Sequence, residues 1–451
     1  MSIRNRVLKG GMVVTVGQAV GVMLSLYIQH LLATNIHKND VGMYFLLASF
    51  GGMFTIIINL GMDRAAVRLI AGEVARNNFK KAHEFVKRFL MTVTGSAFVF
   101  VLFYILFISD LLISSFVPDL VVVPAIFVAI WIGLESIKAS IVEILRGFQK
   151  MTSVVLLGNI LGKGLFAMTL FLVSLFLVEI EIKDVVLINC WVAAIILIAG
   201  GVLLKRIKVD PRVKLTADSK ELYIIGPPIM GILLISTLNR EVDLWIVSYF
   251  LTEEDTAVYG VASRLAQFVT ILMMVVTSVL PPIISELYST SKVEKLQGIM
   301  RATTLICTSA SALMVLVFLL IGDHIIELIY TKDYLDAYML LVVLGVGKLL
   351  GVIAGSSGLV LMMTNYQGLQ LKILGATFCL SVILSIVLVP YFGAIGAAIA
   401  SAIGMALQNI IMTYYVYKKL GIKVHLFYSP LIMRETLVHI YEYLGQSIKK
   451  F

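Results

Sequence analysis

Several charged side chains of this sequence lie inside long apolar runs. Five of them are basic: Lys138, Lys163, Arg240, Arg264 and Lys348. Three are acidic: Glu135, Glu241 and Asp243. A charge at the centre of a bilayer costs about 2.5–3.5 kcal/mol. If these runs cross a membrane, most of the charges must therefore face water, a partner charge or a substrate. Because bases outnumber acids, the interior is net basic and favours a permeant anion.

Helical spacing divides these residues into pairs and isolated cations. Glu135 and Lys138 stand three residues apart and share a helix face, as do Arg240 and Asp243. Either pair suits a neutralised structural pair as well as a binding site, and Lys138 is also near enough to its helix end to snorkel. Three cations have no acid three or four positions away and are the stronger candidates for an anion-binding cavity: Lys163, Arg264 and Lys348.

Uncharged polar side chains accompany these cations. Asn239 precedes Arg240 and lies on the same helical face as Ser236. Gln267 shares a face with Arg264. The counterpart in the first span is polar but uncharged: Gln18, Ser25 and Gln29.

The composition places most of the chain in a membrane. Its 451 residues are 60% hydrophobic and 14% charged, against about 25% charged in typical globular proteins. This excludes a cytosolic enzyme, a disordered chain and a secreted disulfide scaffold. The three cysteines and six histidines are scattered, with no disulfide framework, metal-ligand spacing or nucleophile motif around them. We therefore expect transport rather than enzymatic activity, with no metal and no cofactor.

Twelve apolar stretches are long enough to cross roughly 30 Å of hydrocarbon as helices. The first six lie near 10–32, 42–62, 89–109, 119–145, 151–178 and 184–204, and the second six near 222–250, 257–285, 302–321, 335–362, 368–390 and 394–417. Alternating the loops between two sides puts 28 of the 36 Lys and Arg residues on one side and 3 on the other. This positive-inside signal places both termini in the cytoplasm and explains the net charge of +9 without nucleic acid.

The order of the spans predicts an all-α polytopic membrane protein with two six-helix lobes in a parallel pseudo-twofold repeat. Residues 33–52 resemble 251–270 in layout, with Tyr44 corresponding to Tyr259 at an offset of 215 positions. We expect an N-terminal lobe over 1–206, a cytoplasmic linker over 207–221, a C-terminal lobe over 222–420 and a cytoplasmic amphipathic tail over 421–451.

Two segments outside the spans, 72–88 and 429–447, mix apolar and charged positions. They are predicted to form helices on the cytoplasmic surface. Pro227–Pro228 and Pro281–Pro282 lie near the predicted cytoplasmic ends of the seventh and eighth spans, where they interrupt helical hydrogen bonding. Static kinks and hinges are both consistent with such pairs.

The stretch NREVDLWIVSYFLTEEDTAVYGVASRLAQFV (239–269) carries a family resemblance, echoed in the first half by NDVGMY (39–44). It resembles the multidrug/oligosaccharidyl-lipid/polysaccharide (MOP) flippase superfamily, and within it the polysaccharide-transport branch of Wzx-type O-antigen flippases. The shared pattern is an Asp in span seven, a short outer turn and a Val/Gly/Tyr cluster that opens span eight. The twelve-span layout extends the resemblance over nearly the whole chain and implies a V-shaped, MATE-like fold.

The resemblance implies a function as well. Such a protein moves undecaprenyl-pyrophosphate-linked oligosaccharide, for example an O-antigen unit of lipopolysaccharide, across the cytoplasmic (inner) membrane by alternating access. Its partners would be this substrate, membrane lipids and other glycan-assembly membrane proteins. Arg240, Asp243 and Arg264 fall in the motif region, and the other site residues are inferred from charge and polarity. The candidate substrate-binding set is Arg240, Arg264, Lys348, Lys163, Lys138, Asn239 and Gln267, and the candidate ion- or proton-coupling set is Asp243, Glu135 and Glu241.

Three alternatives stay open at this point. A cation-coupled MATE-type multidrug exporter belongs to the same superfamily, although the first span here lacks the acid that such antiporters often carry. A lipid II flippase is similar too, but commonly has two further spans. A non-transporting scaffold for a glycan-assembly complex would have no need of the buried cations.

Overall fold

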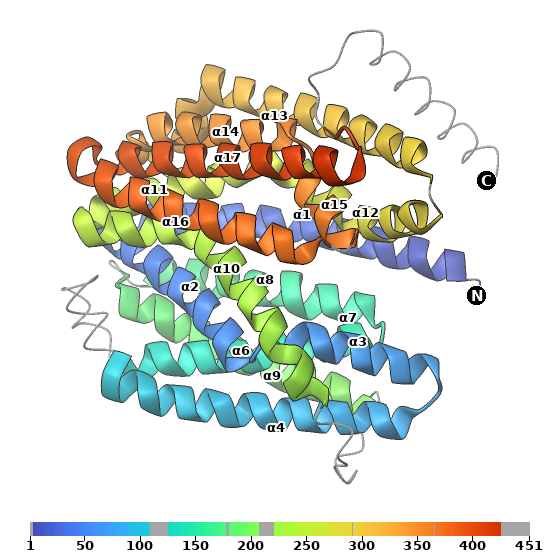
Figure 1. Ribbon diagram of the computed structural model, residues 1–451. Coiled ribbons are helices and arrows are strands. Elements are labelled where there is room, and N and C mark those ends of the chain that lie inside the picture. Colours follow the sequence, from blue (N-terminus) through green and yellow to red (C-terminus); the bar gives the residue numbers. More distant parts are fainter. Residues whose placement is uncertain are drawn as a thin grey trace. The chain divides into compact units, whose positions relative to one another are not determined.

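The computed structural model describes residues 3–108, 125–176, 180–206, 221–290, 292–364 and 366–424, with side chains of the first helix from Val16 onward. Within these ranges the regular structure is helical apart from one isolated bridge between Ile36 and Ile180 (Figure 1). The all-α prediction is confirmed. Residues 207–220 of the predicted linker (207–221) and the predicted amphipathic segment 429–447 lie outside the described residues.

The chain forms two compact units, each with its own packing. Unit 1 is Met1–Glu241 with Ile329–Thr331, and unit 2 is Val242–Leu328 with Lys332–Phe451. The division falls inside one long helix, α10 (Glu221–Phe250), whose first part belongs to unit 1 and whose end belongs to unit 2.

Unit 1 is arranged around the helix α6 (Ala125–Gly147). The other helices of the unit are α1 (Ile3–Asn35), α2 (Lys38–Ile58), α3 (Met62–Ala75), α4 (Phe79–Phe103), α7 (Met151–Val155), α8 (Gly162–Phe176) and α9 (Ile182–Arg206). Two π-helical turns, η1 (Tyr104–Ile108) and η3 (Leu156–Leu161), continue α4 and join α7 to α8. The α6 helix packs against α2, α3, α4 and α9. Burial of α6 residues such as Ile132, Ile144 and Leu145 therefore holds the charged α6 residues at fixed positions.

Unit 2 is built around α17 (Ala394–Leu420), which packs against α14 (Ala337–Ile353) and α16 (Gln367–Phe392) (Figure 1). Its other elements are α11 (Glu253–Ala266), η5 (Gln267–Thr270), α12 (Ile271–Ser289), α13 (Val293–Ile329), η6 (Lys332–Tyr334) and α15 (Ser357–Met363). Glycines permit the close helix contacts. A Cβ on Gly347 would stand 2.6 Å from the Cβ of Ala402, and one on Gly404 would stand 2.8 Å from the Cβ of Ser381.

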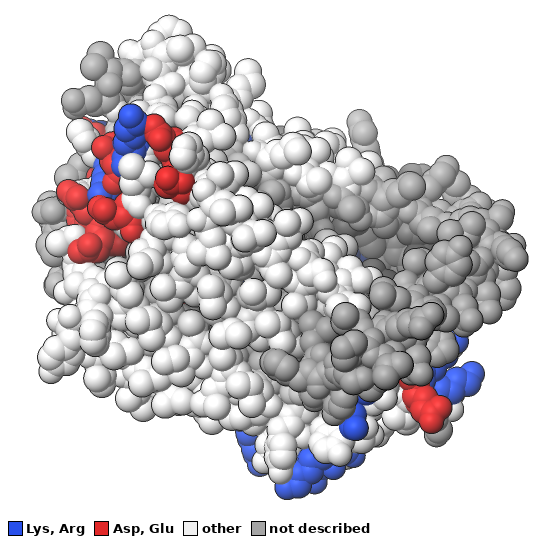
Figure 2. Space-filling model, turned by 90° about the horizontal axis from the view of Figure 1, so that it is seen from above, with Lys and Arg blue, Asp and Glu red and all other residues white. Residues whose placement is uncertain are grey.

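The predicted spans are confirmed in number and position. Eleven helices of the described part are long and apolar enough to cross a membrane, and α14 with α15, bent by 45°, makes a twelfth if the pair counts as one span. On the face drawn in Figure 2, charged side chains gather at two opposite edges. The surface between those edges suits contact with hydrocarbon.

Two details differ from the sequence prediction. The tenth span is broken, because Gly355 has a φ of +74° between α14 and α15. The segment 72–88 is not one helix: α3 ends at Ala75, Asn77 has a φ of +58°, and α4 starts after Asn78, whose Oδ1 accepts from the Lys81 amide. The proline pairs lie inside α10 and α12, which continue through them.

The turn between α2 and α3 is the tightest feature of unit 1. Leu60 and Gly61 both have left-handed φ values, +52° and +65°. A Cβ on Gly61 would meet the Gly226 carbonyl oxygen at 2.5 Å, so α10 rests directly on this turn. Asn59, with none of its surface exposed, donates from Nδ2 to Asp63 Oδ1 at 3.0 Å. The turn thereby buries a carboxylate next to the first part of α10.

Candidate functional site

A polar cluster in unit 1 contains three of the predicted site residues. On α6, Lys138 Nζ lies 2.5 Å from Glu135 Oε2, which is the predicted same-helix pair. The Lys138 side chain is 17% exposed and that of Glu135 is 40% exposed. This pair therefore lies at the surface of the unit rather than in its core, and it is accessible to water or to a ligand.

Lys163 on α8 belongs to the same cluster but has neutral partners. Its Nζ donates to Ser25 Oγ at 2.7 Å and to the Gly21 carbonyl oxygen at 3.0 Å, both on α1. Ser25 Oγ in turn donates to the Gly21 oxygen at 2.9 Å. The half-buried ammonium is thus held by the dipoles of a hydroxyl and a carbonyl group. Lys138 is near enough to repel it electrostatically.

The backbone explains how α1 comes within reach of Lys163. Gly21 faces Asn159, so close that an added Cβ would stand 3.2 Å from the Asn159 Cβ. Asn159 lies in the π-helical turn η3, just before α8. A π-helical turn displaces the side chains that follow it and is frequent at functional sites. The sequence patterns did not predict this π-helical turn. The feature of the sequence that marks it is the group of glycines around it, Gly158, Gly162 and Gly164.

Unit 2 holds a different kind of polar site, around Asp243 on α10. Asp243 is only 5% exposed, and it accepts from Ser385 Oγ on α16 at 3.5 Å. Tyr259 on α11, itself 2% exposed, lies close enough to interact electrostatically with this carboxylate. The Asp243 carboxylate is thus nearly covered between three helices. The predicted pairing of Asp243 with Arg240 stays a prediction, and the Arg240 guanidinium donates to Thr237 Oγ1 at 3.2 Å.

The other predicted residues occupy separate positions. In unit 1, Asn239 is half-buried and bonds to the Ile235 carbonyl oxygen at 3.2 Å, Arg240 is exposed and Glu241 is half-buried. In unit 2, Arg264 on α11 and Lys348 on α14 are half-buried on two helices that pack together, while Gln267 in η5 is exposed. Within the described residues, no three His, Cys, Asp or Glu side chains could hold a metal ion.

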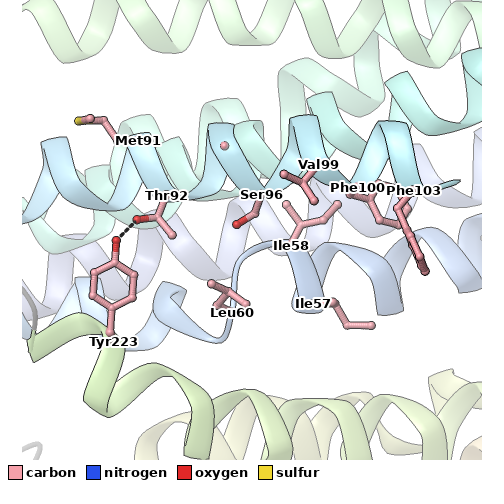
Figure 3. A pocket seen from close by; sticks show the side chains of 11 residues that line it. Ile57, Ile58, Leu60, Met91, Thr92, Ser96, Val99, Phe100, Phe103 and Tyr223 are labelled. Carbon is pink, nitrogen blue, oxygen red and sulfur yellow. Dashed lines mark hydrogen bonds between the residues drawn. The ribbon is translucent and has the colours of Figure 1, made fainter. Parts of the chain in front are cut away.

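Unit 1 also contains an apolar groove that sequence reasoning missed. A cavity of about 660 Å³ lies between α2, α4 and the start of α10 (Figure 3). It is lined by Ile57, Ile58, Leu60, Met91, Thr92, Gly95, Ser96, Val99, Phe100, Phe103 and Tyr223. The hydroxyls of Thr92 and Tyr223 meet at one end, 2.6 Å apart.

Comparisons with known proteins agree with this architecture. Residues 7–288 match the family model described as "Polysaccharide biosynthesis protein". The chain belongs to this polysaccharide biosynthesis family. A second model, described as MatE, matches residues 228–387. The polysaccharide biosynthesis family and MatE transporters both fall within the MOP superfamily, whose predicted membership is confirmed.

Relatives of this family member come from archaea. It is 24% identical over 184 residues to the probable low-salt glycan biosynthesis flippase Agl15 of Haloferax volcanii, a match that spans 40% of this chain and only 38% of that protein. It is 24% identical over 442 residues to an uncharacterized membrane protein of Methanocaldococcus jannaschii, covering 93% of this chain and 86% of the relative.

Solved structures share the fold. An inward-facing multidrug resistance MATE transporter of the MOP superfamily superimposes with a TM-score of 0.74 at 15% identity, over 91% of this chain and 98% of that one. A MOP superfamily transporter from Pyrococcus furiosus, described as having a binding pocket of reverse polarity, gives 0.63 at 14% identity, over 92% and 95%. At such identities the likeness establishes the MATE-like fold alone.

Proposed function

We propose that this protein is a flippase for lipid-linked oligosaccharide and works by alternating access. The observation that carries the proposal is the Lys163 ammonium, which lies within a membrane span beside Lys138 and is held by the neutral oxygens of Ser25 and Gly21. Placing a charge there is costly, so the position suits a protein that attracts an anion. A lipid diphosphate is such an anion, and the family match and the glycan-flippase relative support it.

Each predicted site residue then has a role. The diphosphate binds the cations through charge-assisted hydrogen bonds, and the amides of Asn239 and Gln267 bond to sugar hydroxyls. The diphosphate-binding cations are Lys138, Lys163, Arg240, Arg264 and Lys348. The acids Glu135, Glu241 and Asp243 exchange an ion or a proton with the substrate. The carrier is undecaprenyl pyrophosphate or a related lipid, and an O-antigen unit is one possible cargo.

The orientation belongs to the proposal as well. Both termini and the basic loops face the cytoplasm, so the substrate is loaded from the cytoplasmic leaflet of the inner membrane. Other membrane proteins of glycan assembly deliver the substrate and receive it.

Deletion of the gene tests this function directly. We expect lipid-linked oligosaccharide to accumulate in the inner leaflet, where externally added glycosidase cannot reach it. Wild-type protein and Lys163→Arg should release it, and Lys163→Met should not. Lys372→Met is the matched control, because Lys372 is an exposed lysine on α16. Normal export in the deletion strain, or full rescue by Lys163→Met at equal expression, would refute the proposal.

A cation-coupled multidrug exporter is the second candidate. The MatE match over residues 228–387 favours it, because this range contains the buried Asp243 and its partner Ser385. An exporter predicts drug resistance on overexpression and no glycan defect on deletion. The same deletion strain therefore distinguishes the two functions. A vesicle flipping assay with added lipid II tests whether the protein is a lipid II flippase.

A further inference from the structure

The groove of unit 1 lies along a membrane span and opens sideways. Its rim is formed by large apolar side chains that are 38–64% exposed: Ile57, Met91, Val99 and Phe103. Its floor is nearly covered, since Ile58 is 2% exposed and Phe100 is 8% exposed. Gly95 keeps the groove open, because a Cβ placed there would meet nothing within 4 Å. In a bilayer, this hollow faces hydrocarbon.

The length of the groove matches one leaflet. The lining residues on α4 run from Met91 to Phe103, which corresponds to about 18 Å at 1.5 Å per residue. The hydrocarbon core of a bilayer is roughly 30 Å thick, so one leaflet accounts for about 15 Å of it. A single chain of an ordinary bilayer lipid fills such a groove along its length, whereas a long polyprenyl chain extends well beyond it.

One end of the groove is polar and basic. Thr92 Oγ1 and the Tyr223 hydroxyl meet there at 2.6 Å, as the dashed line in Figure 3 shows. The Arg88 guanidinium lies 5.9 Å from the centre of the Tyr223 ring, one helical turn before Thr92. This end lies toward the start of α4, which the loop charges assign to the cytoplasmic side. Thr92 Oγ1 donates to the Arg88 carbonyl oxygen at 2.9 Å, so the Tyr223 hydroxyl donates to Thr92. The group at this depth that attracts a phosphate is therefore the Arg88 guanidinium.

We propose that the groove between α2, α4 and α10 binds one anionic lipid of the cytoplasmic leaflet, with a hydrocarbon chain along α4 and the phosphate at Arg88. The charge of Arg88 complements the phosphate, and the apolar lining removes one chain from contact with neighbouring lipids. The lipid also bridges α4 to the first part of α10, which otherwise meets α4 here through Tyr223. This site is separate from the Lys138–Lys163 cluster and does not depend on the substrate proposed above.

Native mass spectrometry of the full-length protein, released from phosphatidylcholine nanodiscs that contain phosphatidylglycerol, tests the proposal. We expect one retained phosphatidylglycerol per wild-type protein. Gly95→Trp fills the groove and should lower the apparent affinity at least tenfold. Arg88→Gln removes one basic contact near an anionic headgroup and should lower it about fivefold. Gly52→Trp is the control, because Gly52 is also exposed with open space around it and does not line the groove.

The outcomes separate clearly. Retention of phosphatidylglycerol by Gly95→Trp at the wild-type level would overturn the proposal, as would equal loss in Gly52→Trp. Binding of added polyprenyl phosphate, but not of phosphatidylglycerol, would also overturn the proposal. It would indicate that the groove holds the tail of the substrate. Thermal unfolding of every variant verifies that the fold is intact. Glycan export is measured separately, so failure of this site leaves the flippase function standing.

Discussion

The polar sites of the two units differ in how far their charged side chains are covered. In unit 1, Lys163 and Lys138 stand at the unit's surface, and Lys163 is held by neutral oxygens of α1. In unit 2, Asp243 is almost fully covered and bonds to Ser385. The partly exposed cation is accessible to a ligand, whereas the covered acid is shielded from bulk water. Under the proposed function, unit 1 binds the anion and unit 2 couples an ion or a proton.

Reversing the charge in unit 1 is the strongest way to break this comparison. Lys163→Glu puts a carboxylate where the proposed diphosphate binds, and like charges in contact cost several kcal/mol. We expect flipping in reconstituted vesicles to fall at least about a thousandfold, while Lys372→Glu stays near wild type. Measurable flipping by Lys163→Glu would show that the unit 1 cluster does not bind the anion.

The left-handed glycines of the two units provide a matched pair for stability. Gly61 in unit 1 has φ +65° and ψ 7°, and Gly421 in unit 2 has φ +68° and ψ 6°. Gly421 has open space for a Cβ, but at Gly61 a Cβ would stand 2.4 Å from the Met230 amide nitrogen. Gly421→Ala should cost about 1 kcal/mol of unfolding free energy from the backbone alone, and Gly61→Ala about 3–4 kcal/mol. Thermal unfolding in detergent measures both, and equal losses would contradict the close contact between α10 and the α2–α3 turn.

The carboxyl group of Asp63 is expected to make unit 1 more stable at acidic pH than at neutral pH. Burial raises the pKa of its carboxyl to about 6, the Asn59 amide opposes the shift, and Glu143 adds to it. Because the folded state binds the proton more tightly than the unfolded state, stability is greatest below pH about 4 and falls as the pH rises through about 6. The free energy of unfolding is about 3 kcal/mol lower at neutral pH than below pH about 4. About 2 kcal/mol of this difference arises between pH 4.5 and 7.5.

The pH dependence is measured as the difference between wild type and Asp63→Asn. Unfolding free energies of both proteins, compared at pH 4.5 and 7.5, cancel the titration of all other groups. The free energy of unfolding of Asp63→Asn, relative to that of wild type, should increase progressively as the pH rises. Parallel pH profiles for the two proteins would mean that Asp63 is not buried in the folded state.

The smallest effect is expected at the acidic site of unit 2. Ser385→Ala removes one donor to Asp243 over a long distance of 3.5 Å and should cost about 1 kcal/mol of unfolding free energy. Ser381→Ala on the same helix, where the hydroxyl meets only the Ala400 carbonyl oxygen at 3.4 Å, is the comparison variant. A loss of ion coupling in Ser385→Ala but not in Ser381→Ala would sharpen the division between the units.

The helices could be predicted from the sequence, but the contacts between side chains of different helices could not. The apolar runs located the twelve spans because the bilayer imposes their length. The depth of Lys163 and the pairing of Glu135 with Lys138 followed from position along one helix. The contact between Lys163 and Ser25 did not, since it joins residues that are 138 positions apart and depends on the π-helical turn η3.

Breaks and grooves were also beyond the sequence. The tenth span was predicted as one helix, yet it bends at Gly355, which has a φ of +74°. A Cβ there would also stand 2.5 Å from Thr304 Oγ1, a contact with another helix. The apolar groove is formed by residues from α2, α4 and α10, whose apolar side chains are ordinary for membrane spans when each span is considered by itself. Features that arise between helices cannot be derived from the pattern within one helix.

The connection between α10 and α11 has a consequence for biogenesis. Only Leu251 and Thr252 separate Phe250 from Glu253, and Thr252 forms a capping box with Asp255 that starts α11 without a loop. We expect two spans joined so tightly to insert into the membrane together as one helical hairpin, because a two-residue connection gives neither helix room to insert independently. An epitope inserted at this turn would separate the two insertion events, and the second half of the protein would then have to find its topology without its leading hairpin.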